Sequence, residues 1–107
     1  MTVTHNWGVK GFVLPLINNG GKDLEIRLGH PIFKKAKVGD LIVFNGKVTR
    51  KIVAIRAYPN LASAINSDDN QRIYPGVGKT ELLSLLKKVL RGNDEKLGAI
   101  IVELQTP

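Results

Sequence analysis

The sequence predicts an α+β domain, a small mixed β-barrel with two or three flanking helices. An Asn45-Gly46 hairpin signal joins an apolar run to a long mixed strand, Lys47–Tyr58, in which neither face is cleanly apolar. An amphipathic pattern then predicts a helix that starts near Gly78, and an apolar run, Leu97–Leu104, forms the closing strand. With 107 residues, 43% hydrophobic and 23% charged, the chain has room for one core, so residues 1–107 form a single domain.

The N-terminal segment, residues 6–19, is predicted to be a short or kinked helix. Pro15 disturbs a helix interior, and an Asn-Asn-Gly stop signal follows at residues 18–20. Trp7, the only tryptophan, lies at the start of this segment and is either a partly buried anchor or a side chain that stacks on a base. The apolar residues at helical spacing are Val9, Phe12, Val13, Leu16 and Ile17.

Residues 22–28 predict a strand with an acid and a base on one face. Because side chains alternate along a strand, Glu25 and Arg27 share the face opposite the apolar residues at positions 24, 26 and 28. By the same alternation Lys22 falls on the apolar face, but the Gly20-Gly21 turn is able to redirect its side chain. The polar face is either solvated, which is ordinary in an antiparallel sheet, or it lines a binding groove.

The next segments predict a hairpin. Residues 32–38 form a basic connector, and Gly39-Asp40 turns into a strand over residues 41–45. Asn45-Gly46 suits a type I′ turn because both residues tolerate positive φ angles. The mixed faces of the strand over residues 47–58 indicate a β-bulge.

The second half of the chain predicts a short helix over residues 61–66, a loop over residues 67–78 and a longer helix. Gly78 or Thr80 caps the longer helix, Glu81 lies in its first turn, and Gly92 ends it. Its predicted buried stripe consists of Leu82, Leu85, Leu86, Val89 and Leu90, and its basic last turns hold Lys87, Lys88 and Arg91.

The run from Gly76 to Thr80 ends like a phosphate-binding P-loop, G-x-x-x-x-G-K-[ST]. The first glycine of that motif is replaced by Ile73, and the preceding residues do not form a buried strand. Nucleotide hydrolysis by a P-loop is therefore rejected.

The order of these segments resembles the ASCH domain family, whose small β-barrel is related to the PUA RNA-binding fold. The resemblance covers nearly the whole chain and implies a PUA-like barrel. It is carried by Gly21-Lys22 with Glu25 and Arg27, by Gly39-Asp40, by Tyr58-Pro59 and by Pro75-Gly76 before the helix.

Composition limits the partners. Sixteen basic against nine acidic residues give a net charge of +7, which attracts polyanions such as nucleic acid. The absence of cysteine, of a signal segment and of a long apolar run leads us to expect a cytoplasmic protein that binds no membrane. His5 and His30 lack the spacing of metal ligands, so we expect neither a metal nor a cofactor.

These observations and the resemblance predict a protein that binds RNA or a modified nucleoside in a charged cleft. Lys22 and Arg27 would contact phosphate or base edges, Glu25 would accept from an amino group, and Tyr58 or Tyr74 would stack on a base. The predicted phosphate contacts of the basic connector are Lys34, Lys35 and Lys37.

Two other function classes stay open at this point. The resemblance also implies small amidohydrolases acting on acetylated cytidine, or ribonucleases, in which the lysine corresponds to Lys22 and a carboxylate comes from Asp68 or Asp69. In those amidohydrolases a threonine stands three residues after the lysine. This chain has Glu25 at that position, and Glu25 would have to act with Lys22 as an acid and base pair. The other alternative is an adaptor of transcription or translation that binds a protein partner through its basic face.

Overall fold

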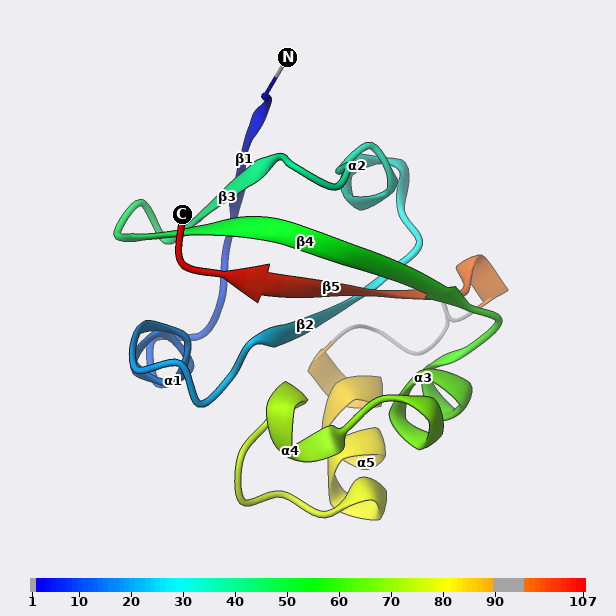
Figure 1. Ribbon diagram of the computed structural model, residues 1–107. Coiled ribbons are helices and arrows are strands. Elements are labelled where there is room, and N and C mark those ends of the chain that lie inside the picture. The colour runs from blue at the N-terminus through cyan, green and yellow to red at the C-terminus, as the bar shows by residue number, and fades with distance from the viewer. Residues whose placement is uncertain (1, 90–95) are drawn as a thin grey trace.

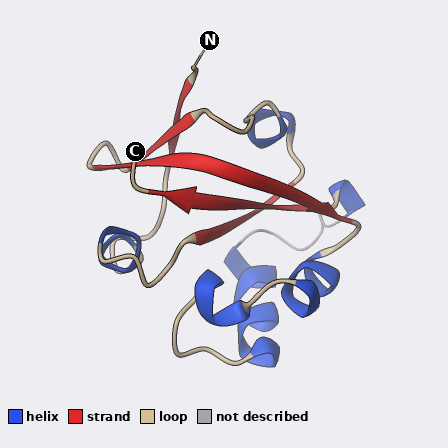
Figure 2. Ribbon diagram, viewed as in Figure 1, coloured by secondary structure: helices blue, strands red, loops and turns tan. Residues whose placement is uncertain are grey.

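The computed structural model describes residues 2–89 and 96–107. Figure 1 shows a sheet with α3, α4 and α5 gathered next to β2 and β5, and Figure 2 shows the same view by secondary structure. The strands are β1 (Thr4–Trp7), β2 (Leu24–Leu28), β3 (Leu41–Phe44), β4 (Val48–Tyr58) and β5 (Ala99–Gln105). The helices are α1 (Leu14–Asn18), α2 (Pro31–Lys34), α3 (Leu61–Ser67), α4 (Asn70–Ile73) and α5 (Lys79–Val89).

The sheet is mixed, which confirms the predicted α+β class. Its strand order is β1-β3-β4-β5-β2; β1 runs parallel to β3, and the other neighbours are antiparallel. Within the described residues no backbone ladder joins β1 to β2, so the predicted barrel closure is not observed. A side chain spans these two edges instead, because Arg27 Nη2 on β2 donates to the Gly8 carbonyl after β1 at 2.9 Å.

The predicted hairpin and bulge are confirmed. Asn45 and Gly46 have φ angles of 53° and 69°, as a type I′ turn requires, and they connect β3 to β4. The register of β4 against β5 shifts between Ile52 and Ala54. A bulge interrupts the alternation of side chains along β4, which explains why neither face of this strand is cleanly apolar in the sequence.

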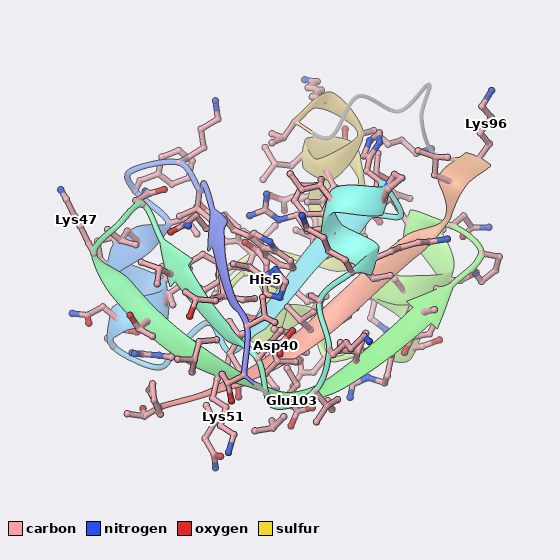
Figure 3. All side chains as sticks on the ribbon, turned by 90° about the horizontal axis from the view of Figure 1, so that it is seen from above. His5, Asp40, Lys47, Lys51, Lys96 and Glu103 are labelled. Carbon is pink, nitrogen blue, oxygen red and sulfur yellow. The ribbon has the colours of Figure 1, made fainter. Side chains whose placement is uncertain are left out.

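The N-terminus differs from the prediction, because it forms β1 before the short helix α1. Trp7 ends this strand at 4% exposure and packs edge-on against Phe33 and Phe44, so it is a buried anchor. His5 points from the same strand toward Asp40 (Figure 3). The expected helix is short because Pro15 stands in its first turn, where the missing N–H is harmless.

Two segments predicted without helices contain short ones. The basic connector begins with α2, because Pro31 is well placed at a helix start. The predicted loop over residues 67–78 contains α4, capped by the Asp69 carboxylate, which accepts from the Gln71 N–H at 2.9 Å. Helix α3 confirms the prediction for residues 61–66.

Helix α5 begins as predicted, but its apolar stripe is only partly buried. Leu82 is fully buried, whereas Leu85 and Val89 are 37% and 49% exposed. The predicted stripe residue Leu90, the basic Arg91 and the terminal Gly92 lie outside the described residues. Strand β5, the last strand of the chain, lies between β4 and β2, close to where the sequence predicted the last strand.

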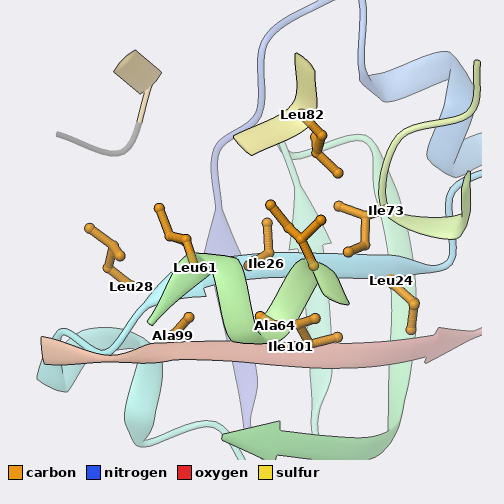
Figure 4. Packing of buried hydrophobic residues seen from close by; sticks show 10 residues of the cluster. Leu24, Ile26, Leu28, Leu61, Ala64, Ile73, Leu82, Ala99 and Ile101 are labelled. Atoms are coloured by element: carbon orange, nitrogen blue, oxygen red, sulfur yellow. The ribbon is translucent and has the colours of Figure 1, made fainter. Parts of the chain in front are cut away.

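Two groups of buried side chains fill the two sides of the sheet. One group joins β2 and β5 to helices α3, α4 and α5, and Figure 4 shows Leu61 and Ala64 of α3 packed over Ile26 and Ile101. The other group joins β1, β3 and β4 to α1, and it includes Trp7, Phe44 and Ile52 among others. The apolar residues of β2 belong to the first group. Its charged residues, Glu25 and Arg27, lie on the opposite face of the strand.

In the part of the chain that the structure describes, no helix is long and apolar enough to cross a membrane.

Candidate functional site

The charged face of β2 is buried. Glu25 is 6% exposed and Lys22 is 4% exposed, and the Arg27 side chain is 13% exposed. The interpretation of this face as a solvated surface is therefore wrong. Because burial of a charge is costly unless it is paired, the three residues need each other in the folded protein.

Lys22 holds two elements together. It precedes β2, and the turn redirects its side chain as the sequence allowed. Its Nζ donates to the Leu24 carbonyl at 2.8 Å and to the Ile73 carbonyl of α4 at 2.7 Å, and it lies 3.0 Å from Glu25 Oε1. These three acceptors match the three N–H groups of an ammonium group.

Arg27 binds the second oxygen of the Glu25 carboxylate. Its Nη2 donates to Glu25 Oε2 at 2.8 Å and to the Gly8 carbonyl at 2.9 Å. Its guanidinium carbon lies 5.2 Å from the ring centroids of both Trp7 and Phe33, which is a cation–π distance. The Arg27 Nε group is buried and has no hydrogen-bond partner among the residues that the structure describes.

Glu25 is ionised between these cations. Burial by itself raises the pKa of Glu25, but the charges and hydrogen bonds of Lys22 and Arg27 outweigh burial and hold the pKa below its ordinary value of 4.5. Glu25 Oε1 also accepts from the Ile26 N–H at 3.2 Å. Two cations against one anion leave this buried cluster with one excess positive charge.

A pocket of about 310 Å³ lies beside the cluster. Its lining includes Lys22, Glu25 and Arg27, which we call its floor, and residues of the half-exposed stripe of α5, which we call its aliphatic wall. The lining also includes Phe12 and Tyr74, which we call its aromatic wall; their ring centroids lie 6.5 Å apart at 49°. The residues of α5 in the aliphatic wall are Leu82, Leu85, Leu86 and Val89.

Strand β2 also presents its backbone to this pocket, because β2 is an edge strand. The Leu104 N–H donates to the Asp23 carbonyl, and the Gly29 N–H donates to the Gly98 carbonyl. Hydrogen-bonded pairs alternate in an antiparallel ladder, so the peptide groups of Ile26 point to the open edge. Ile26 lines the pocket, and its carbonyl adds an acceptor to the floor.

The structure brings together some of the predicted site residues and separates others. Lys22, Glu25, Arg27 and Tyr74 all line the pocket. Tyr58 lies at the end of β4, where its hydroxyl donates to Asp68 Oδ2 at 2.6 Å. The predicted basic residues Lys34, Lys35 and Lys37 lie in and after α2, and Lys35 and Lys37 line a second groove beside β1.

Sequence reasoning did not assign Phe12 or Lys10 to the site, although both line the pocket. Phe12 was predicted to lie on a helix, but it stands before α1 and is 64% exposed. A large exposed aromatic residue is a signal for a binding surface, yet exposure of Phe12 is visible only in three dimensions.

Asp68 belongs to a separate ionic network outside the pocket. It pairs with Arg56 at 2.6 Å, Arg56 reaches Glu103 at 3.1 Å, and Arg72 pairs with Asp23 at 2.8 Å. Burial raises the pKa of Asp68, but hydrogen bonds from Arg56 and Tyr58 outweigh it and lower the pKa. The same Asp68 hydrogen bond raises the pKa of Tyr58.

His5 and Asp40 form a buried pair at the second groove. His5 Nε2 lies 2.8 Å from Asp40 Oδ2, and this hydrogen bond is the main cause of the lowered Asp40 pKa. Over residues 2–89 and 96–107, no three acidic, histidine or cysteine side chains gather as a metal site would require.

No family model matches the chain. No curated protein matches it either.

Two solved structures share its fold. The crystal structure of hypothetical protein PH0355 superposes with a TM-score of 0.91 at 25% identity, covering 96% of this chain and 98% of that one. The solution NMR structure of protein PF0455 from Pyrococcus furiosus has a TM-score of 0.81 at 25% identity, with 96% of both chains covered. These similarities support the fold along almost the full length of the chain.

Proposed function

We infer that the protein binds a nucleobase or modified nucleoside, free or within a single RNA strand, in the pocket beside Glu25 and Arg27. The observation that carries this inference is the combination of a charged floor, apolar walls and two aromatic rings in one small pocket. A nucleobase has flat apolar faces and a polar edge, so it matches such a pocket.

The size of the pocket favours one base over a helix. Pockets that bind small ligands typically measure about 300–1,000 Å³, and this pocket, at about 310 Å³, lies at the small end. Sequence-specific RNA recognition mostly uses single-stranded bases that splay out and stack on aromatic side chains. Phe12 and Tyr74 are placed for such stacking, and the faces of the base would contact the aliphatic wall of α5.

Each floor residue has a distinct role in this proposal. Glu25 accepts from an amino group of the base through the remaining acceptor capacity of Oε2, and Arg27 holds Glu25 in position. The Ile26 carbonyl accepts a second N–H, and the excess positive charge of the cluster favours a ligand that presents carbonyl or anionic oxygens. Lys22 fixes α4, and with it Tyr74, against β2.

The net charge of the chain supports a nucleic-acid ligand. At +7 the protein attracts RNA, and Lys10 stands at the pocket where a phosphate next to the bound base would lie. The resemblance to the ASCH domain family points to the same class of ligand. A cytoplasmic location, where RNA is abundant, fits this function and stays a prediction.

The geometry favours binding over hydrolysis. An acid and base pair needs a group that takes up a proton readily, but the lowered pKa of Glu25 makes it a weak base. Lys22 already donates to two carbonyls and to Glu25. Asp68 and Asp69 are engaged with Arg56 and with the start of α4, and neither lines the pocket.

The test is an NMR titration of the labelled protein with cytidine, N4-acetylcytidine and short single-stranded RNAs. We expect amide shifts at Glu25, Ile26 and Tyr74 with no turnover of the nucleoside. Phe12→Ala should weaken binding by about 1–3 kcal/mol, the usual contribution of one base stack. Val38→Ala is the matched control, because Val38 is 61% exposed and lies outside the pocket.

Two results would contradict the proposal. Equal affinity of the Phe12→Ala and Val38→Ala variants would remove the aromatic wall from the binding site. Loss of the acetyl signal during the titration would show hydrolysis instead of binding alone.

A further inference from the structure

A second groove, of about 680 Å³, lies on the other edge of the sheet and plays no part in the proposed function. One side is β1, the edge strand opposite β2, and the other is the segment that contains α2 (Figure 3). Its lining includes Thr4 and Asn6 from the strand, and Ile32, Lys35 and Lys37 from the facing segment.

The backbone of β1 presents hydrogen-bonding groups to this groove. The Leu41 N–H of β3 donates to the Val3 carbonyl at 2.9 Å, and the Asn45 N–H donates to the Trp7 carbonyl at 3.1 Å. Odd-numbered residues of β1 therefore direct their peptide groups to β3, and the peptide groups of Thr4 and Asn6 point away from it. Such an edge is a template for an additional strand.

The chemistry of the groove is apolar and positively charged. Val3 and Ile32 are 47% and 58% exposed, so each offers apolar surface to a side chain of an added strand. Lys35 and Lys37 supply two exposed cations. Among the described residues of the lining, the one carboxylate is Asp40, which is already satisfied by His5, by the Val3 N–H at 3.2 Å and by the Lys37 N–H at 3.0 Å.

We propose that this groove binds an extended acidic peptide segment of a partner protein. The segment adds to β1 as a further strand through the Thr4 and Asn6 peptide groups, and its carboxylates pair with Lys35 and Lys37. Main-chain hydrogen bonds supply affinity in this mode of recognition, and side chains at alternate positions supply specificity. An RNA phosphate backbone would use the lysines but would leave the strand edge and the apolar residues without a role.

The experiment titrates the labelled full chain with a synthetic peptide of alternating glutamate and valine residues, at low salt. We expect amide shifts at Thr4, Asn6, Lys35 and Lys37. The double variant Lys35→Glu/Lys37→Glu should bind at least tenfold more weakly. The matched control Lys47→Glu/Lys51→Glu changes two exposed lysines on the β3–β4 hairpin and β4, away from the groove, and should bind as the unchanged protein does.

Backbone pairing is tested with N-methylated peptides. Methyl groups on one set of alternating peptide nitrogens should abolish binding, and methyl groups on the other set should be tolerated. Asn6→Pro removes an outward N–H on an edge strand, where proline is tolerated, and should also weaken binding at least tenfold.

Three outcomes would overturn the proposal. Equal binding of both methylated peptides would mean that charge alone attracts the peptide. Equal binding of a peptide of alternating lysine and valine would remove the charge argument. Stronger shifts of the same amides with single-stranded RNA than with the acidic peptide would make the groove a phosphate site. None of these results bears on the nucleoside pocket, which is tested by Phe12→Ala.

Discussion

The molecule holds two ionic clusters of similar chemistry in different environments. In the pocket cluster, Lys22, Glu25 and Arg27 have side chains that are 4%, 7% and 13% exposed. In the outer network, Arg56, Glu103 and Arg72 are 34%, 29% and 40% exposed, and Asp68, at 10%, is its most buried member. The outer network ties β4 and β5 to the segment after α3, as solvent-accessible pairs commonly do.

The difference in burial makes the pocket cluster the one whose presence needs an explanation. Exposed pairs contribute about 0–1 kcal/mol each, and their presence needs no special explanation. A buried cluster is often no more stable than apolar side chains of the same volume, so stability alone does not account for its position beside a pocket, whereas the proposed ligand recognition would. Three substitution experiments test this contrast, from the largest expected effect to the smallest.

The largest effect is expected from Glu25→Gln. Removal of the carboxylate charge leaves Lys22 and Arg27 buried without compensation, which should cost about 3–5 kcal/mol in the free energy of unfolding. The matched control is Glu103→Gln in the outer network, for which we expect about 0–1 kcal/mol. Urea unfolding followed by circular dichroism measures both; equal losses would show that the two clusters do not differ.

A smaller effect, of opposite sign, is expected from replacing the whole pocket cluster. In the triple variant Lys22→Met, Glu25→Leu and Arg27→Met, no charge remains in this cluster, so stability should be unchanged or higher by about 1–4 kcal/mol. Nucleoside binding, followed by the NMR titration, should be lost. A triple variant as unstable as Glu25→Gln would mean that the cluster is retained for folding and not for a ligand.

The smallest effect is expected in the dependence of stability on pH. The folded-state pKa of Glu25 lies below its ordinary value of 4.5, so its contribution is fully present above that pH and is lost as the pH falls through the lowered pKa. The pKa of Asp68 is also lowered in the folded protein, so its contribution to stability is likewise lost as the pH falls. Glu25→Gln should therefore flatten the stability curve below about pH 4.5, and an unaltered slope between pH 4.5 and 2 would contradict the ionised state of Glu25.

Local patterns predicted several features correctly. Asn45-Gly46 specified its turn because two consecutive positive φ angles are unfavourable for most other residues. The spacing of Glu25 and Arg27 placed both on one face of β2, and it matches the observed ion pair. These features depend on neighbours in the chain, and so periodicity revealed them.

Other features of the candidate site depend on segments far apart in the chain. The sequence left open whether Glu25 and Arg27 lie on a solvated face or in a groove, and only the structure shows that Trp7 and Phe33 contact Arg27. Lys22 reaches Ile73 across 51 positions of sequence, a contact that no local pattern encodes. Tyr58 and Tyr74 looked equivalent in sequence, but only Tyr74 lines the pocket.

The sequence by itself determined the α+β class, the hairpin, the bulge, most of the strands and the identity of the charged residues on β2. These follow from backbone preferences and side-chain periodicity, which act over a few residues. Only the tertiary structure decided that the charges are buried, that α5 leaves Leu85 and Val89 to form a pocket wall, and that β1 and β2 remain as open edges. Burial and edges arise when distant segments pack together, because only then is water excluded from one face of a strand and not from another.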